Sequence, residues 1–96
     1  MASMTVIAKV SPGKRGEFLQ AVETLHDEGE AQRGLTKFTL YQELQDQSGF
    51  CLMYEWKSQE VLDRYMEAEN FHVLVGALKT LCERSEIRYS TCEDTH

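Results

Sequence analysis

The stretch from Phe50 to Phe71 changes from a strand-like to a helix-like pattern within one continuous run, FCLMYEWKSQEVLDRYMEAENF. Its first part alternates with the period of two that is typical of a strand, and one face of this strand carries Phe50, Leu52, Tyr54 and Trp56. Ser58 is a good N-cap, and apolar residues then recur at helical spacing. The segment therefore predicts a strand that leads directly into a helix.

The rest of the chain also alternates between the two patterns. The predicted strands cover residues 4–10, 35–44, 50–57 and 85–92. The predicted helices cover residues 14–33, 58–69 and 71–82. Gly34 is expected to end the first helix and Asn70 to break the later helical stretch, while the polar run 45–49 predicts a hairpin.

This β-α-β-β-α-β order is that of the ferredoxin-like split βαβ arrangement, an α+β fold with a four-stranded antiparallel sheet and helices on one face. We expect a single domain over residues 1–96, with residues 1–3 and 93–96 mobile. The other face of the strand at 50–57 carries Cys51 and Met53, so both of its faces are largely apolar. A second copy of the chain, packed on the open face of the sheet, would cover this apolar surface. We therefore predict a homodimer.

Composition excludes several classes of partner. The net charge of −6 and the lack of a basic stripe argue against nucleic acid and against anionic membrane surfaces. No apolar run reaches transmembrane length, and the N-terminal residues lack the pattern of a signal peptide. The three cysteines have no CxxC spacing, which is typical of reduced thiols in a cytoplasmic protein.

Polar and aromatic side chains in and after the predicted third strand are the candidates for a site. Trp56, Tyr54 and Tyr65 can line an aromatic pocket, or they can be core aromatics. Asn70 can hold a substrate oxygen, or it can break the helix. His72 can accept a proton, or it can be a surface residue. His26, beside Asp27, is expected to be solvated, and no histidine has the spacing of a metal site.

The chain resembles the antibiotic biosynthesis monooxygenase (ABM) superfamily over about residues 4–89. The pieces that carry the resemblance are, in order, Pro12-Gly13-Lys14, Glu17-Phe18, Gly34-Leu35, Phe38, Leu40-Tyr41-Gln42, Phe50, Trp56, Ser58, Val61-Leu62 and Phe71. The resemblance implies a dimeric α+β barrel with a pocket between sheet and helices in each subunit. It also implies cofactor-independent oxygenation of aromatic or quinol compounds, with haem degradation in one branch.

The chain departs from the family pattern at four positions. Tyr65 and Asn70 stand where the family often has histidines, Tyr54 where an acidic residue is common, and Val75 where haem-degrading relatives have the histidine ligand. We therefore expect no haem and no metal cofactor. The expected function is monooxygenation of a small aromatic, phenolic or quinol compound; the alternative is a non-catalytic ligand-binding or interaction module on the same dimeric fold.

The resemblance also implies roles for individual residues in such a site. Trp56, Tyr54, Tyr65 and Phe71 would bind the ring of the substrate. Asn70 and His72 would bind oxygen or move the proton.

Overall fold

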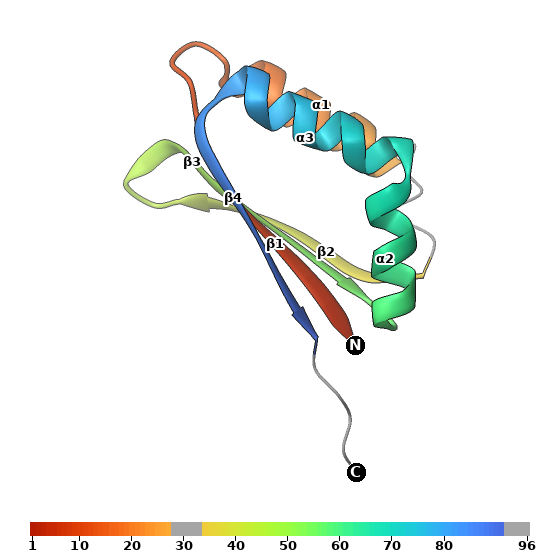
Figure 1. Cartoon of the computed structure of the whole chain (residues 1–96). Helices are drawn as coiled ribbons and strands as arrows, with labels where there is room; N and C mark the ends of the chain where they lie inside the picture. The colour runs from red at the N-terminus through yellow and green to blue at the C-terminus, as the bar shows by residue number, and fades with distance from the viewer. Residues whose placement is uncertain (28–33, 92–96) are drawn as a thin grey trace.

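The ferredoxin-like α+β fold is confirmed by a computed structural model, which describes residues 1–27 and 34–91 (Figure 1). Its elements, in chain order, are β1 (Ala2–Val10), α1 (Arg15–Asp27), β2 (Leu35–Glu43), β3 (Asp46–Trp56), α2 (Gln59–Glu67), α3 (Glu69–Leu81) and β4 (Cys82–Thr91). Two consecutive helices thus occupy the place of the second helix in the simple β-α-β-β-α-β scheme. No described helix is long and apolar enough to span a membrane.

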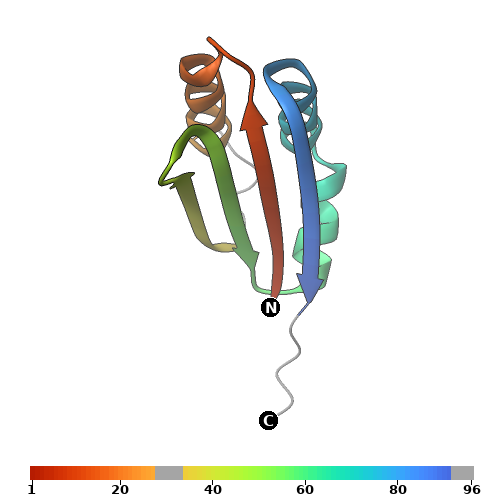
Figure 2. The same cartoon turned by 90° about the vertical axis from the view of Figure 1, so that its left-hand side faces the viewer.

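The four strands form one antiparallel sheet in the order β2-β3-β1-β4. All three helices lie on one face of this sheet, and the opposite face is open, as Figure 2 shows from the open side. Central β1 pairs with β3 and with β4, so that Val6 lies opposite both Leu52 and Ile87. This register places the even-numbered residues of β1 and β3 under the helices.

The core lies between the sheet and the helices. Every second residue of β1 is buried there, from Ala2 to Val10. The helices add buried side chains at helical spacing, namely Phe18, Val22, Leu62, Tyr65, Leu74, Leu78 and Leu81. Each large apolar side chain buried in this way stabilises the fold by about 1.5–3 kcal/mol relative to exposure.

The break between α2 and α3 lies two residues before the expected position. The backbone leaves the helical region at Ala68, which ends α2 and begins α3 with φ −75° and ψ 152°. Asn70 is inside the first turn of α3, so the prediction that it breaks the helix is wrong. Ser58 caps α2 as expected, because its Oγ accepts a hydrogen bond from the Val61 N–H at 3.3 Å.

Other boundaries also differ from the expectation. Ala2 is buried and pairs with both Trp56 and Thr91, so the first strand begins two residues before the expected start at residue 4. Gly34 has a φ of +74°, and a Cβ there would lie 2.8 Å from a methyl group of Val61, so only glycine fits. The expected end of the first helix, within 28–33, and the tail at 92–96 lie outside the described residues.

Candidate functional site

Five aromatic side chains form a continuous cluster between the sheet and the helices. This aromatic cluster consists of Phe38, Tyr54, Trp56, Tyr65 and Phe71. Tyr54 and Trp56 lie two apart on β3, so both face the helices, and their rings stack with centroids 5.5 Å apart. Tyr65 of α2 packs against both, at 6.2 Å and 5.1 Å. The expected ring-binding residues are thus brought together.

Both ends of the cluster extend to neighbouring elements. Phe38 of β2 lies opposite Tyr54 in the sheet, with ring centroids 4.8 Å apart. Phe71 of α3 meets the ring of Tyr65 edge-on at 5.6 Å. The cluster therefore connects two strands with the two consecutive helices.

Trp56 carries a buried donor that the fold leaves unused. Its side chain is completely buried, and its indole Nε1 has no hydrogen-bond partner within the described ranges 1–27 and 34–91. Leaving a buried donor unsatisfied costs about 1–3 kcal/mol, and native proteins rarely tolerate this without a reason. An oxygen atom of a bound ligand would satisfy this N–H group.

Asn70 holds the aromatic cluster to the first helix. The Tyr65 hydroxyl donates a hydrogen bond to Asn70 Oδ1 at 3.1 Å, and Asn70 Nδ2 donates to the Leu25 carbonyl of α1, also at 3.1 Å. One amide thus connects α1, α2 and α3. Burial raises the pKa of Tyr54 and of Tyr65 above the ordinary range, so both phenols stay protonated at neutral pH, and the Tyr65 hydroxyl is the donor to Asn70.

The side chains of His72 and His26 have different surroundings. His72 is exposed on α3, and its ring lies 6.2 Å from that of Phe71 at an angle of 60°. His26, in the last turn of α1, is half-buried and stacks on Phe38 at 4.6 Å. The expectation that His26 is solvated is therefore wrong. The spacing of the sequence could have predicted this burial, because His26 follows the buried residues Phe18 and Val22 at intervals of four and so lies on the same face of α1.

His26 also lines a cavity of about 310 Å³ beside the aromatic cluster. The other lining residues belong to the first part of β2 and are Leu35, Thr36, Lys37 and Phe38. Leu35 pairs with Trp56 and Phe38 with Tyr54, so two residues of the cavity wall are the neighbours in the sheet of the two cluster residues of β3. Within the described residues, no group of three or more histidine, cysteine or acidic side chains is arranged to bind a metal.

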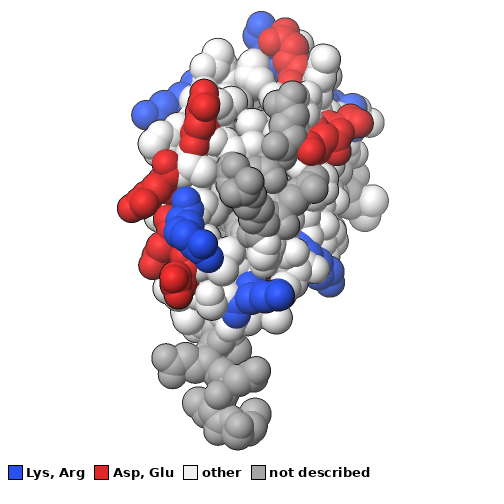
Figure 3. Space-filling model, turned by 90° about the vertical axis from the view of Figure 1, so that its right-hand side faces the viewer, with Lys and Arg blue, Asp and Glu red and all other residues white. Residues whose placement is uncertain are grey.

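A second, larger cavity of about 570 Å³ lies on the open face of the sheet. Its lining combines apolar Ile7, Tyr41 and Cys51 with charged side chains, among them Lys9, Arg84, Asp46 and Glu86. No pattern in the sequence indicated a cavity here. The surface on the opposite, helix-covered side carries positive and negative side chains interspersed, as Figure 3 shows.

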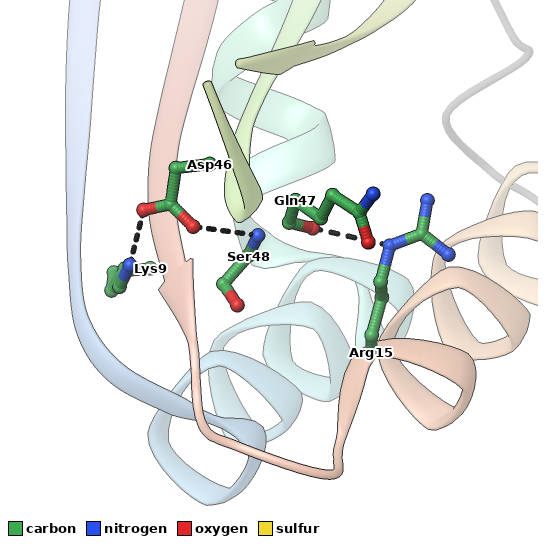
Figure 4. Close-up of polar contacts among 5 residues, drawn as sticks. All are labelled: Lys9, Arg15, Asp46, Gln47 and Ser48. Atoms are coloured by element: carbon green, nitrogen blue, oxygen red, sulfur yellow. Dashed lines mark hydrogen bonds and ion pairs between the residues drawn. The ribbon is translucent and has the colours of Figure 1, made fainter. Parts of the chain in front are cut away.

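The start of β3, which borders this open-face cavity, is held by β1 and by α1 (Figure 4). The Lys9 ammonium pairs with Asp46, whose Oδ1 accepts a hydrogen bond from the Ser48 N–H at 2.9 Å. These contacts, with Lys9 the largest, hold the pKa of Asp46 below its usual value. From α1, Arg15 donates from Nε to the Gln47 carbonyl at 3.1 Å. The hairpin therefore has a fixed position at the edge of the cavity.

Comparison with known proteins agrees with this fold. Residues 1–77 match the family model described as "Antibiotic biosynthesis monooxygenase". The chain is 26% identical to the protein named "Putative monooxygenase YcnE" of Bacillus subtilis (strain 168), over 84% of this chain and 85% of the relative.

Solved structures similar to this one have the same architecture. A conserved protein from Methanosarcina mazei Go1 is 24% identical and superimposes with a TM-score of 0.83, covering 97% of this chain and 94% of its own. A variant of SnoaB, a cofactor-independent oxygenase from Streptomyces nogalater, gives 0.82 at 20% identity, covering 98% and 94%. Because the family model spans most of the chain, the protein belongs to the antibiotic biosynthesis monooxygenase family.

Proposed function

We propose that the protein is a monooxygenase that acts without metal or haem on a small phenolic or quinol compound bound against the aromatic cluster. The observation that carries the proposal is the buried, unsatisfied Nε1 of Trp56 within this cluster. A ring hydroxyl or carbonyl oxygen is an acceptor for this donor, and the planar rings around it suit a planar substrate. Family membership and the likeness to SnoaB support the reaction type.

The reaction proceeds from a deprotonated ring hydroxyl. The phenolate delocalises its charge onto a ring carbon, which forms a bond to O₂ and gives a ring peroxide anion. This anion takes back the proton that left the ring hydroxyl and becomes a hydroperoxide. The O–O bond then breaks as the ring C–H proton leaves, so that one oxygen atom remains as a quinone carbonyl and the other takes up that proton and departs as water. The substrate supplies all the electrons, and the step needs no external reductant.

The roles of the site residues follow from their positions. Tyr54, Trp56, Tyr65 and Phe71 bind the ring. The Trp56 N–H stabilises the negative charge that develops on the substrate oxygen. Asn70 holds Tyr65 through the bond at 3.1 Å and so positions the phenol rather than touching the substrate. For the proton, His72 is the residue expected from the sequence, and its role stays a prediction.

Oxygen uptake tests this proposal. Purified protein is incubated with a panel of substituted hydroquinones and naphthols while dissolved O₂ is followed, and the Trp56→Phe variant serves as the control because it keeps an aromatic ring but lacks the N–H. We expect turnover by the wild type and a loss of about 10²-fold in kcat for the variant, the usual cost of removing one such donor. Equal rates for both proteins, or no uptake by the wild type above the protein-free rate, would contradict it.

A non-catalytic binding module is the second candidate. It is favoured because no residue of the aromatic cluster ionises near neutral pH: Tyr54 and Tyr65 stay protonated. Asn70 already uses both its amide oxygen and its amide nitrogen in hydrogen bonds within the protein. Fluorescence of Trp56, the single tryptophan, distinguishes the two candidates. Quenching by a quinol that is not consumed would support the binding module.

We also propose that two copies form a homodimer through their open sheet faces. The face exposes Ile7, Tyr41 and Met53 around the cavity of about 570 Å³. Its charges are balanced although the chain carries a net charge of −6. By register and cavity lining, the face carries Lys9, Lys37, Arg84 and Arg88 together with Glu43, Asp46, Glu55 and Glu86. A second copy therefore meets no net repulsion there.

Sedimentation velocity at micromolar concentration tests the dimer, and a monomer there would contradict it. A Tyr41→Glu substitution adds an unpaired charge to the proposed interface. It should shift the population towards monomer, whereas the same change at exposed Val73 on α3 should not. We place the protein in the cytoplasm, a proposal that the free thiols of Cys51 and Cys82 support.

A further inference from the structure

We propose that His26, rather than His72, is the imidazole that accepts the proton of the bound substrate. The inference rests on the proposed function, because it assigns the base of the same reaction. His26 lines the cavity of about 310 Å³ together with Phe38, which is itself a member of the aromatic cluster. No family pattern in the sequence pointed to this residue, which lies before the segment from Phe50 to Phe71.

Ring contacts connect His26 directly to the candidate site. Its imidazole stacks on Phe38 at 4.6 Å with an angle of 23°, and Phe38 in turn contacts Tyr54 at 4.8 Å. Tyr54 stacks on Trp56 at 5.5 Å. A substrate in this cavity would therefore contact both the imidazole of His26 and Phe38, which is a member of the aromatic cluster.

The backbone at this position is anchored to the same site. Leu25, the residue before His26, accepts the hydrogen bond from Asn70 Nδ2 at 3.1 Å, and Asn70 also holds the Tyr65 hydroxyl. The last turn of α1 is thus fixed relative to α2 and α3. A general base must lie within hydrogen-bond reach of the proton that it takes, so a fixed position is what this role requires.

Other groups near the aromatic cluster fit the role less well. His72 is exposed and does not line the cavity. The raised pKa of Tyr54 and Tyr65 keeps these phenols protonated near pH 7. Lys37 lies on the open face of the sheet by its register with Glu55, and Asp27 follows His26 as an exposed residue at the end of α1. An imidazole is the side chain whose ordinary titration range suits proton transfer at neutral pH.

The proton follows a closed path in this scheme. It moves from the ring hydroxyl to an imidazole nitrogen of His26, which leaves the phenolate that reacts with O₂. The imidazolium then returns the proton to the distal oxygen of the ring peroxide anion, which becomes the hydroperoxide, and the imidazole is neutral again. When the O–O bond breaks, the distal oxygen leaves as hydroxide and takes up the ring C–H proton to form water.

The matched variants His26→Gln and His72→Gln test the assignment. We expect His26→Gln to lower kcat by about 10²–10⁴-fold, the usual contribution of a general base, with KM changed less than about threefold. The acidic limb of the wild-type pH–rate profile should disappear in this variant and persist in His72→Gln. Retained activity and an unchanged pH profile in His26→Gln would overturn the inference. Thermal unfolding of both variants verifies that they are folded.

A second measurement does not need turnover. The imidazole proton resonances are assigned from the two variants, and the wild type is titrated with 2-naphthol without oxygen. His26 resonances should move and those of His72 should not. If they move but the wild type consumes no O₂, the oxygenase proposal fails while His26 stays in the ligand site. If O₂ is consumed, His26→Gln is fully active and the His26 resonances stay fixed, only the assignment of His26 fails.

Discussion

The helix-covered face and the open face of the sheet consist of side chains from the same strands, but the two faces differ in burial and polarity. On β3, Tyr54 and Trp56 turn towards the helices into a closed aromatic environment, whereas Cys51 and Met53 turn to the open face beside charged residues. The closed face leaves a buried indole donor unsatisfied, and the open face leaves apolar side chains exposed. The proposals made above assign a different kind of partner to each face: a small polar-aromatic ligand to the closed face and a second copy of the chain to the open face.

The largest expected effect on the free energy of unfolding comes from truncating one of two neighbouring residues that lie on opposite faces of the sheet. Leu52 is completely buried under the helices and Met53 is 38% exposed on the open face. Leu52→Ala should lower the free energy of unfolding by about 2–5 kcal/mol because it leaves a cavity in the core. Met53→Ala should cost less, with a loss that depends on protein concentration if the open face is a dimer contact. Urea unfolding at two protein concentrations measures both.

The next largest effect on stability concerns the hydrogen bonds of Asn70 on the closed face. Asn70→Ala removes the acceptor of the Tyr65 hydroxyl and the donor to the Leu25 carbonyl, and it should destabilise the protein by about 1–3 kcal/mol. His72→Ala, two residues further on the exposed side of α3, should change the stability by less than about 0.5 kcal/mol. Equal losses in the two variants would mean that the hydrogen bonds of Asn70 contribute nothing to stability.

Alkaline pH should lower the stability of the protein through the two buried tyrosines of the closed face. The pKa values of Tyr54 and Tyr65 are raised by burial, so folding keeps both phenols protonated while the unfolded chain ionises above about pH 10. The contribution to stability is complete below pH 10 and is lost as the pH rises towards the folded pKa values. Each tyrosine should lower the stability by about 1 kcal/mol per pH unit in that range. Tyr65→Phe should reduce the slope of stability against pH, measured by chemical denaturation.

The smallest effect is expected on the open face. The ion pair of Lys9 and Asp46 is solvent-accessible, so Asp46→Asn should lower the stability at pH 7 only slightly. Because the pKa of Asp46 is lowered, its contribution is present above the ordinary value of 3.8 and is lost as the pH falls further. The wild type and the variant should therefore converge in stability below pH 4. Lys14→Met, which breaks the more exposed pair with Glu17, is the control.

The sequence predicted most of the fold because its periodicity is regular. The alternation in residues 50–57 placed Tyr54 and Trp56 on one face, and the spacing after Ser58 placed Tyr65 against them. The helix break was displaced because Ala68 has no side chain that forms a cap, so no residue type indicates it. The burial of Ala2 depends on pairing with Trp56 and Thr91, distant contacts that local patterns do not reveal.

The candidate site was predicted only in part. Its aromatic residues lie close together in the sequence, so their common location could be recognised from one segment. His26 comes from another helix, and its approach to Phe38 depends on how α1 packs on the sheet. The hydrogen bond from Asn70 to Leu25 joins residues 45 positions apart, and sequence spacing gives no access to such a contact.

The central position of β1 has a consequence for how the chain reaches its fold. β1 is the first strand in the sequence, yet its pairing partners are β3 and β4, and Ala2 lies opposite Thr91. During synthesis, almost the whole described chain must be made before β3 and β4 can pair with both edges of β1. Until then, the apolar residues of β1 stay uncovered. Such non-local pairing slows folding and leaves an unpaired strand open to aggregation in the meantime. We therefore expect chains that stop before β4 to be poorly soluble, even though they contain every member of the aromatic cluster.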